Sequence, residues 1–289
     1  MVLGAAIATT YALLILGNLV TTTGSGLDCP DWPLCHGTVI PPPEIGIWIE
    51  WSHRLLGGVT GVLIIFSAIY ILVRTTGVIR LFMKILLGAI VVVVLLGGWI
   101  VLSEAPYLDS IRRIAIVSSH ILTAAMIWTL LVLAYRPISK GVHETLEDNY
   151  PLWLFGMVIV QIFLGVFVRY SNSSLACPDW PLCQGAILPP SFMPEVLIHY
   201  THRLVGYIIF GFTLWRLVKA LQSGDKNLKT HAITFTLVIL QVTFGVLIVW
   251  MKMFLPVLVL HGATAFGILG WTAYQASPGL VSAKDIAKA

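Results

Sequence analysis

The chain has 289 residues, of which 58% are hydrophobic and only 10% are charged, and its mean hydropathy is +0.92. Soluble globular proteins carry about 25% charged residues, so this composition excludes an ordinary soluble domain and is typical of a polytopic membrane protein. The formal net charge of +4 says little about partners, because in a membrane protein the positions of Lys and Arg matter more than their sum.

Eight apolar runs of about 20 residues are long enough to cross a bilayer. They cover residues 2–22, 51–73, 80–102, 114–135, 151–170, 198–219, 231–251 and 255–275. Each is expected to be a helix, because a backbone exposed to lipid must satisfy its own hydrogen bonds. The first run shows no signal-peptide cleavage site and is expected to remain as a span.

A seven-residue stretch follows both the first and the fifth span. Cys29–Cys35 reads Cys-Pro-Asp-Trp-Pro-Leu-Cys, and Cys177–Cys183 repeats it letter for letter 148 positions later. The flanking pair Leu16-Gly17 recurs as Leu164-Gly165 at the same offset. The chain is therefore predicted to be two copies of one four-helix unit. Because each copy has four spans, both insert the same way up, as two tandem bundles related by a pseudo-two-fold axis along the membrane normal.

This repeat predicts four parts of the chain. Residues 1–136 form an N-terminal four-helix half, and residues 151–276 form a C-terminal four-helix half. A charged linker, residues 137–150, joins them, and residues 277–289 are a short polar tail.

The basic residues orient the spans. With the cysteine loops outside, eleven Lys and Arg lie on the inner side and four on the outer side. The inner residues are Arg74, Arg80, Lys84, Arg136, Lys140, Arg216, Lys219, Lys226, Lys229, Lys284 and Lys288, and the outer ones are Arg112, Arg113, Arg169 and Lys252. This asymmetry fits the positive-inside rule and predicts that both termini are cytoplasmic.

The cysteines then face an oxidising compartment, where disulfides persist. We expect the bonds Cys29–Cys35 and Cys177–Cys183, each closing a short loop that contains two prolines and a tryptophan. The bonds could be plain structural staples, or they could be redox-active or face a partner. Metal binding is a weaker third possibility, because only His36 lies near as a further ligand.

Four of the eight histidines lie inside spans, near the outer ends. They are His53, His120, His202 and His261, two in each half, on the second and fourth spans. Ionisable groups at such positions are costly and usually functional. Each is followed four residues later, on the same helix face, by a small residue: Gly57, Ala124, Gly206 and Ala265.

Two facing histidines with small residues beside them predict axial ligation of a flat heme in each half. A small-residue stripe also serves plain helix packing, but its repetition beside all four histidines favours the heme. Zinc is disfavoured, because a structural zinc site takes four N or S ligands and each half supplies two.

Three residues near the outer ends of the helices are also candidates for the functional site. Arg54 and Arg203 directly follow ligand candidates, and they either bind heme propionates or extend toward lipid headgroups. Glu50 lies three residues before His53, where the second half has His199. A carboxylate beside a heme edge can move protons or stabilise developing positive charge. A favourable helix N-terminal charge is the structural alternative.

The sequence resembles the heme A synthase family, membrane enzymes that oxidise heme O to heme A. The resemblance is carried by Glu50-x-x-His53-Arg54, by His120, by His202-Arg203, by His261 and by the paired-cysteine outer loop, and it covers essentially the whole chain. Many members carry the cysteine pair only in the first half, whereas this chain has it in both.

The resemblance implies that the substrate heme O binds His53 and His120, that a heme b cofactor binds His202 and His261, and that Glu50 is the catalytic acid. The reaction would convert a porphyrin methyl to a formyl group through a hydroxymethyl stage. It also implies a multi-pass protein of a prokaryotic plasma membrane, supplied by a heme O synthase, serving terminal oxidase assembly and using an unidentified electron acceptor. Contact with membrane lipid and a possible homo-oligomer are expected, and no nucleic acid.

Two other functions are compatible with parts of the pattern. A diheme b-type cytochrome passing electrons from quinol to an outer acceptor would carry the same four histidines, but it has no evident need for the Glu50/His199 difference. A thiol oxidoreductase would use the loop cysteines. Its reactive pair is typically Cys-x-x-Cys, whereas these pairs are spaced Cys-x5-Cys, and the buried histidines would be unexplained.

Overall fold

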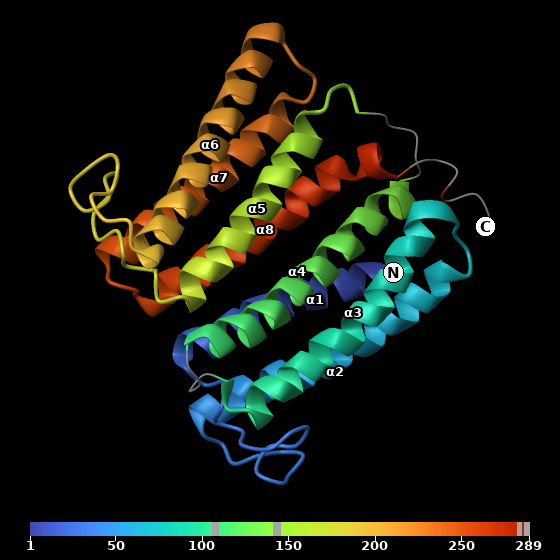
Figure 1. Cartoon of the computed structure of the whole chain (residues 1–289). Coiled ribbons are helices and arrows are strands. Elements are labelled where there is room, and N and C mark those ends of the chain that lie inside the picture. The colour runs from blue at the N-terminus through green and yellow to red at the C-terminus, as the bar shows by residue number, and fades with distance from the viewer. Residues whose placement is uncertain (106–109, 141–145, 282–284, 286–289) are drawn as a thin grey trace. The chain divides into compact units, whose positions relative to one another are not determined.

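The computed structural model describes all residues except 106–109, 141–145, 282–284 and 286–289 (Figure 1). Within the described residues it is all-helical, and its eight helices are each long and apolar enough to cross a membrane. They are α1 (Val2–Thr23), α2 (Ile45–Leu72), α3 (Gly77–Leu102), α4 (Ser110–Lys140), α5 (Tyr150–Tyr170), α6 (Pro194–Ser223), α7 (Leu228–Trp250) and α8 (Leu255–Leu280). The predicted all-α class with eight spans is confirmed.

Several helices extend beyond the apolar runs that predict them. Helix α2 begins at Ile45, six residues before its predicted span, and α6 begins at Pro194, where a proline suits the first helical turn. An apolar run marks only the part of a helix that lies in hydrocarbon, so its polar ends are missed. As a consequence, Glu50 and His199 lie within the first two turns of these helices.

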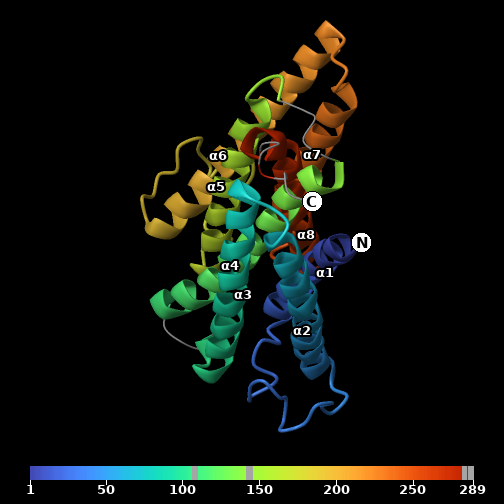
Figure 2. The same cartoon turned by 90° about the vertical axis from the view of Figure 1, so that its right-hand side faces the viewer.

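Residues pack into two compact units. One comprises Met1–Leu152 and Thr272–Ala289, and the other comprises Trp153–Trp271. In the first unit α1 packs on α2, α2 on α3, α3 on α4, and α4 back on α1, which closes a four-helix bundle (Figures 1 and 2). In the second unit α6 packs on α7. Helix α4 continues through Lys140 and α8 through Leu280, so both helices run past the boundaries expected from the repeat.

The apolar core of the first unit gathers at one end of the bundle. It is built from the start of α1, the end of α2, the start of α3 and the later part of α4, with Ala6, Ile64, Ile79, Met83, Leu86 and Leu131 almost fully buried. The cysteine loop and both histidines lie toward the other end. A tightly packed end therefore supports the end that carries the polar groups.

Asp285 binds the N-terminus of α3 within the same unit. Its backbone carbonyl accepts the Thr76 N–H at 3.0 Å, and its Oδ1 accepts the Val78 N–H at 2.7 Å. The α3 N-terminal N–H groups lack partners within the helix, and an acidic residue there is favoured by the helix dipole. This contact falls in the short polar tail predicted for residues 277–289.

Candidate functional site

The two cysteine loops have the same internal structure. Both expected disulfides, Cys29–Cys35 and Cys177–Cys183, are present, which confirms the pairing. In each loop the second cysteine forms a short antiparallel bridge three residues on, to Thr38 in the first copy and to Ala186 in the second. The repeat in sequence is therefore a repeat in three dimensions.

The aspartate inside each loop anchors its turn. In the first loop the Asp31 carboxylate accepts the N–H groups of His36 at 2.6 Å and Gly37 at 2.8 Å. Asp179 does the same for the corresponding turn of the second loop at 2.7 Å each. The Gly37 N–H holds the pKa of the Asp31 carboxyl below its ordinary value, helped by the His36 N–H and by Arg54. The carboxylates are thus kept ionised as acceptors.

Arg54 and Arg203 clamp the loops to the helices that follow them. Arg54 donates to the backbone carbonyls of Asp31, Leu34 and Cys29 at 2.6, 2.5 and 2.9 Å. Arg203 donates to the equivalent carbonyls of the second loop, at 2.7, 2.8 and 2.7 Å. The planar fork of arginine suits several acceptors at once. A role toward heme propionates stays a prediction, and it would have to share the guanidinium with these carbonyls.

Glu50 and His199 occupy the same structural position with different chemistry. The buried Glu50 carboxylate accepts the Cys29 N–H at 2.8 Å through Oε2 and Arg54 at 2.5 Å through Oε1. The buried His199 ring meets the Cys177 N–H at 3.3 Å and Arg203 Nε at 3.1 Å.

A neutral imidazole offers one acceptor nitrogen, whereas a carboxylate offers two oxygens with further lone pairs. His199 can therefore satisfy only one of the two donors that face it. Glu50 satisfies both donors and still has acceptor capacity, so the first half holds a negative charge where the second half holds an imidazole.

The first histidine pair lies in the first unit. His53 on α2 and His120 on α4 are close enough to interact electrostatically. His120 is held by its neighbour α3, because its Nδ1 lies 3.0 Å from the Val93 carbonyl. That bond leaves Nε2 as the free lone pair. The Nδ1 of His53 is buried and has no hydrogen-bond partner among the described residues.

The second histidine pair lies in the second unit and has different neighbours. His202 on α6 and His261 on α8 also interact electrostatically. The amide of Gln161 on α5 donates to the His202 carbonyl at 3.0 Å and lies 3.4 Å from its Nε2. The amide of Gln241 on α7 lies 3.2 Å from His261 Nε2. An amide donor selects the tautomer whose Nε2 is an acceptor, which is the tautomer that can bind iron.

Each of the four histidines faces a glycine on the preceding helix. A Cβ added at Gly17 would lie 3.0 Å from His53 Cε1, and one added at Gly97 would lie 3.3 Å from His120 Cε1. Gly165 and Gly245 stand in the same relation to His202 and His261, at 3.2 and 3.3 Å. The glycines let the imidazoles lie against the neighbouring backbone, which fixes where the rings point.

The small residues predicted beside the histidines pack less closely. A Cβ at Gly57 would meet Leu13 at 3.9 Å, and one at Gly206 would meet the Gln161 amide at 3.5 Å. These are ordinary packing distances. The glycines that hold the imidazoles are instead the ones on α1, α3, α5 and α7, which the sequence analysis did not assign to the site.

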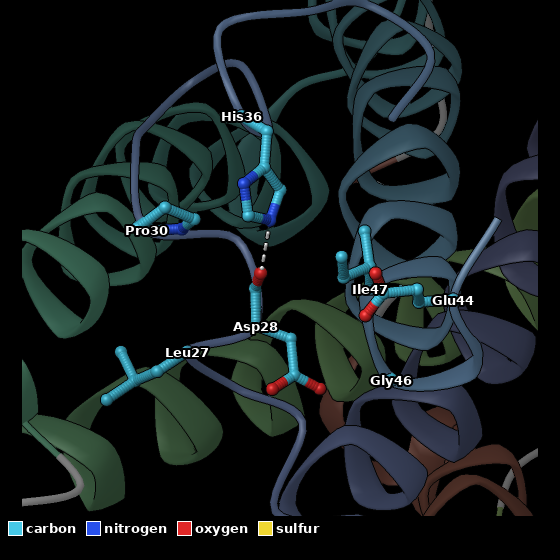
Figure 3. Close-up of a pocket in the computed structure, with 7 residues that line it drawn as sticks. All are labelled: Leu27, Asp28, Pro30, His36, Glu44, Gly46 and Ile47. Atoms are coloured by element: carbon cyan, nitrogen blue, oxygen red, sulfur yellow. Dashed lines mark hydrogen bonds between the residues drawn. The ribbon is translucent and has the colours of Figure 1, made fainter. Parts of the chain in front are cut away.

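A shallow pocket lies between the first loop and the start of α2 (Figure 3). Asp28, His36, Glu44 and Gly46 are among its lining residues, and the His36 Nε2 lies 2.9 Å from the Asp28 carbonyl oxygen. A Cβ at Gly46 would overlap the Asp28 carboxylate, so the acid sits directly against the N-terminal turn of α2. A negative charge there is favoured by the helix dipole.

No cluster of three or more His, Cys, Asp and Glu side chains able to hold a metal ion occurs in the part of the chain that the structure describes. Each histidine pair offers two nitrogen ligands, and two is the number of axial positions on a heme iron. The donor sets therefore suit a metal that brings its own equatorial ligands.

Two features of these sites were not predicted, although the sequence contains evidence for them. Gly17 and Gly97 recur as Gly165 and Gly245, in each case 148 positions later. Gln161 and Gln241 are amides inside apolar spans, where unpaired polar groups are costly. The Val93 carbonyl could not be identified from sequence, because every residue has a backbone carbonyl.

The chain was compared with known proteins. The family model COX15-CtaA, described as cytochrome oxidase assembly protein, matches residues 1–45 and 44–273. The heme A synthase of Bacillus licheniformis is 30% identical over 292 residues, covering 92% of this chain and 93% of that protein. The heme A synthase of Alkalihalophilus pseudofirmus is 31% identical over 265 residues, 86% of each chain, and that of Geobacillus kaustophilus is 29% identical over 285 residues.

Proposed function

The chain belongs to the COX15-CtaA family of cytochrome oxidase assembly proteins, and we propose how its two histidine pairs divide the work of that family. Its function is that of a heme A synthase, a membrane-embedded oxidoreductase that oxidises heme O to heme A.

Substrate heme O binds the first unit, between His53 and His120. One observation carries this assignment: at otherwise repeated positions the first half has the Glu50 carboxylate and the second has His199. Glu50 lies about one helical turn from His53 on the same face of α2. Oxidising a methyl group releases protons and passes through electron-poor carbon, and a fixed carboxylate serves both needs.

The Glu50 carboxylate is already oriented for this role. The Cys29 N–H and Arg54 hold its two oxygens, so the side chain is fixed before substrate arrives. Each carboxylate oxygen has a further lone pair, so proton acceptance does not require breaking either bond. The loop and its disulfide thereby position the acid.

A heme b cofactor binds the second unit, between His202 and His261. The residues fit such a group: both Nε2 atoms are kept as acceptors by glutamine amides, and Gly165 and Gly245 let the imidazoles approach the backbone. When bound, heme b supplies reversible one-electron chemistry that protein side chains lack. The protein's part is to hold the two imidazoles and to exclude water around them.

A diheme electron carrier is the alternative. It would use both histidine pairs equally, and it gives no reason for a carboxylate in one half alone. Family membership favours the synthase.

We further propose that the cysteine loops face the outside of a prokaryotic plasma membrane, with both termini in the cytoplasm. The distribution of basic residues and the two disulfides support this orientation. A heme O synthase as supplier and a terminal oxidase as recipient of the product are the expected partners.

The test is to express the full chain with a source of heme O and to analyse the extracted hemes by mass. Heme A or its hydroxymethyl intermediate is expected from the wild type. In the Glu50→Ala variant the second-unit heme should remain while product is lost. An electron carrier would return heme O unchanged, which would overturn the proposal.

A further inference from the structure

The four histidines of the two sites are not held equally. Three of them have a hydrogen-bond contact from the neighbouring helix to a ring nitrogen: His120 through the Val93 carbonyl, His202 through Gln161, and His261 through Gln241. No such contact is found for His53 within the described residues, and its buried Nδ1 has no partner there. The Nδ1 atoms of His202 and His261 also have no partner among these residues, so His120 alone is held at Nδ1.

The repeat shows what His53 lacks. The carbonyl that holds His120 belongs to Val93, four residues before Gly97 on α3. The register-equivalent residue on α1 is Leu13, four residues before Gly17, and no bond joins its carbonyl to His53 in the described structure.

The second half fills the same two positions with polar side chains. Gln161 corresponds to Leu13 and Gln241 to Val93, each 148 positions along. Both amides contact the neighbouring histidine, and the Oε1 atoms of both are buried without a partner among the described residues. In the second site the amides therefore contact Nε2, whereas in the first site His120 alone of the two imidazoles is held at Nδ1.

A hydrogen bond to the ring nitrogen that does not bind the metal affects the strength of metal binding. A partner on Nδ1 fixes the tautomer and ring orientation of a ligating histidine and raises its basicity. Losing such a partner typically weakens metal binding by roughly 10–100-fold. His120 is therefore the stronger and His53 the weaker of the two axial ligands available to a substrate iron.

We propose that His53 is the exchangeable ligand of the substrate heme iron, while His120 stays bound. In the exchange the bond from iron to His53 Nε2 breaks, the imidazole keeps its lone pair, and an exogenous ligand takes the vacated position. Glu50 lies about one helical turn from His53 on the same face of α2, so the fixed carboxylate would be near the position that His53 leaves. This inference rests on the assignment of heme O to the first unit.

The experiment uses the full-length protein with bound heme O, reduced, with carbon monoxide as the probe and the second-unit heme spectrum as the folding control. Carbon monoxide should bind the wild-type first-unit heme at a rate that saturates with its concentration, because His53 must leave first. In His53→Ala the heme should be retained, and the rate should lose its saturation. Added imidazole should restore the six-coordinate spectrum of that variant. His120→Ala should reduce first-unit heme occupancy more than His53→Ala does.

A matched pair of variants at Leu13 tests whether His53 leaves iron through Nε2. Leu13→Gln introduces in the first half the amide that contacts His202 Nε2 in the second. Because this amide would compete with iron for His53 Nε2, it should speed carbon monoxide binding, whereas Leu13→Met, which adds no donor, should not.

Three results would overturn the inference: a wild-type first-unit heme that binds no carbon monoxide, a reversed order in which His53→Ala loses heme and His120→Ala keeps it, or equal losses in both. Heme A in the wild-type extract separates these from failure of the proposed function. If heme A forms and the kinetics contradict His53 exchange, only the inference fails. If no heme A forms, the function itself fails.

Discussion

Replacing Glu50 by histidine separates the two roles that this carboxylate has in the structure. Glu50 supports the first loop through the Cys29 N–H and Arg54, and it is also the proposed proton acceptor. The second half of the chain already carries histidine at this position, and its loop has the same disulfide, bridge and arginine contacts. Glu50→His should therefore keep the loop and lose the chemistry, whereas Glu50→Ala should lose both.

The expected stability costs follow from the contacts. In Glu50→Ala the buried Cys29 N–H loses its acceptor, which costs about 1–3 kcal/mol. Arg54 also loses its carboxylate, but it keeps three carbonyl acceptors and stays partly exposed, so a total of about 2–4 kcal/mol is expected. In Glu50→His the imidazole accepts one of the two donors, so the cost should be about 1 kcal/mol.

The assay pairs thermal unfolding of the purified protein in detergent with mass analysis of the extracted hemes. The midpoint should fall in the order wild type, Glu50→His, Glu50→Ala, and heme A should be missing from both variants. The reverse exchange, His199→Glu, is the control and should leave product formation intact. Wild-type amounts of heme A from Glu50→His would refute the catalytic role and leave Glu50 as a loop support. An unchanged midpoint in Glu50→Ala would refute the energetic reasoning.

Three further outcomes are expected. Arg54→Lys should lower the thermal midpoint, because one ammonium cannot reach three loop carbonyls and a carboxylate together, and an unchanged midpoint would contradict the clamp. Gly165→Ala should reduce second-unit heme content measured by absorbance, since the added Cβ would crowd the His202 ring at 3.2 Å, with Gly211→Ala in open space as control. The pKa of the Asp31 carboxyl is lower in the folded protein, so its stabilisation of the first loop is present above the unfolded pKa and is lost as pH falls through the folded pKa. Proteolysis of the first loop should therefore rise only in strong acid. Asp31→Asn should remove that acid dependence.

Much of the fold was predictable because the membrane imposes a simple rule on length and polarity. Eight apolar runs gave eight helices, and the duplicated loop gave both disulfides. The helix ends were less predictable. Helix α2 starts six residues before its apolar run, because helical hydrogen bonding continues where the side chains become polar. This shift matters, because it places Glu50 inside a helix whose register carries it toward the loop.

The contacts of the site were harder to predict, because they depend on directions across helix interfaces. The sequence placed Arg54 beside a ligand candidate, but only the loop backbone shows that three carbonyls converge on its guanidinium. Likewise, Gly17 was recognised as part of the repeat, but its contact with His53 depends on how α1 packs against α2. Spacing along one helix predicts which residues share a face, and it says little about what the next helix presents to them.

The two copies share their outer cysteine loops and differ at side chains near the histidines. This pattern suits the two unlike sites that are proposed for them. The seven residues from cysteine to cysteine are identical in both, and the arginine clamp and the aspartate anchor recur in both. The copies differ instead at side chains near the histidines. There the copies carry carboxylate against imidazole at Glu50 and His199, and apolar side chain against amide at Leu13 and Gln161. Under the proposed assignment, the common scaffold sets the position of each histidine pair, and these few substitutions determine whether the heme bound there is held or oxidised.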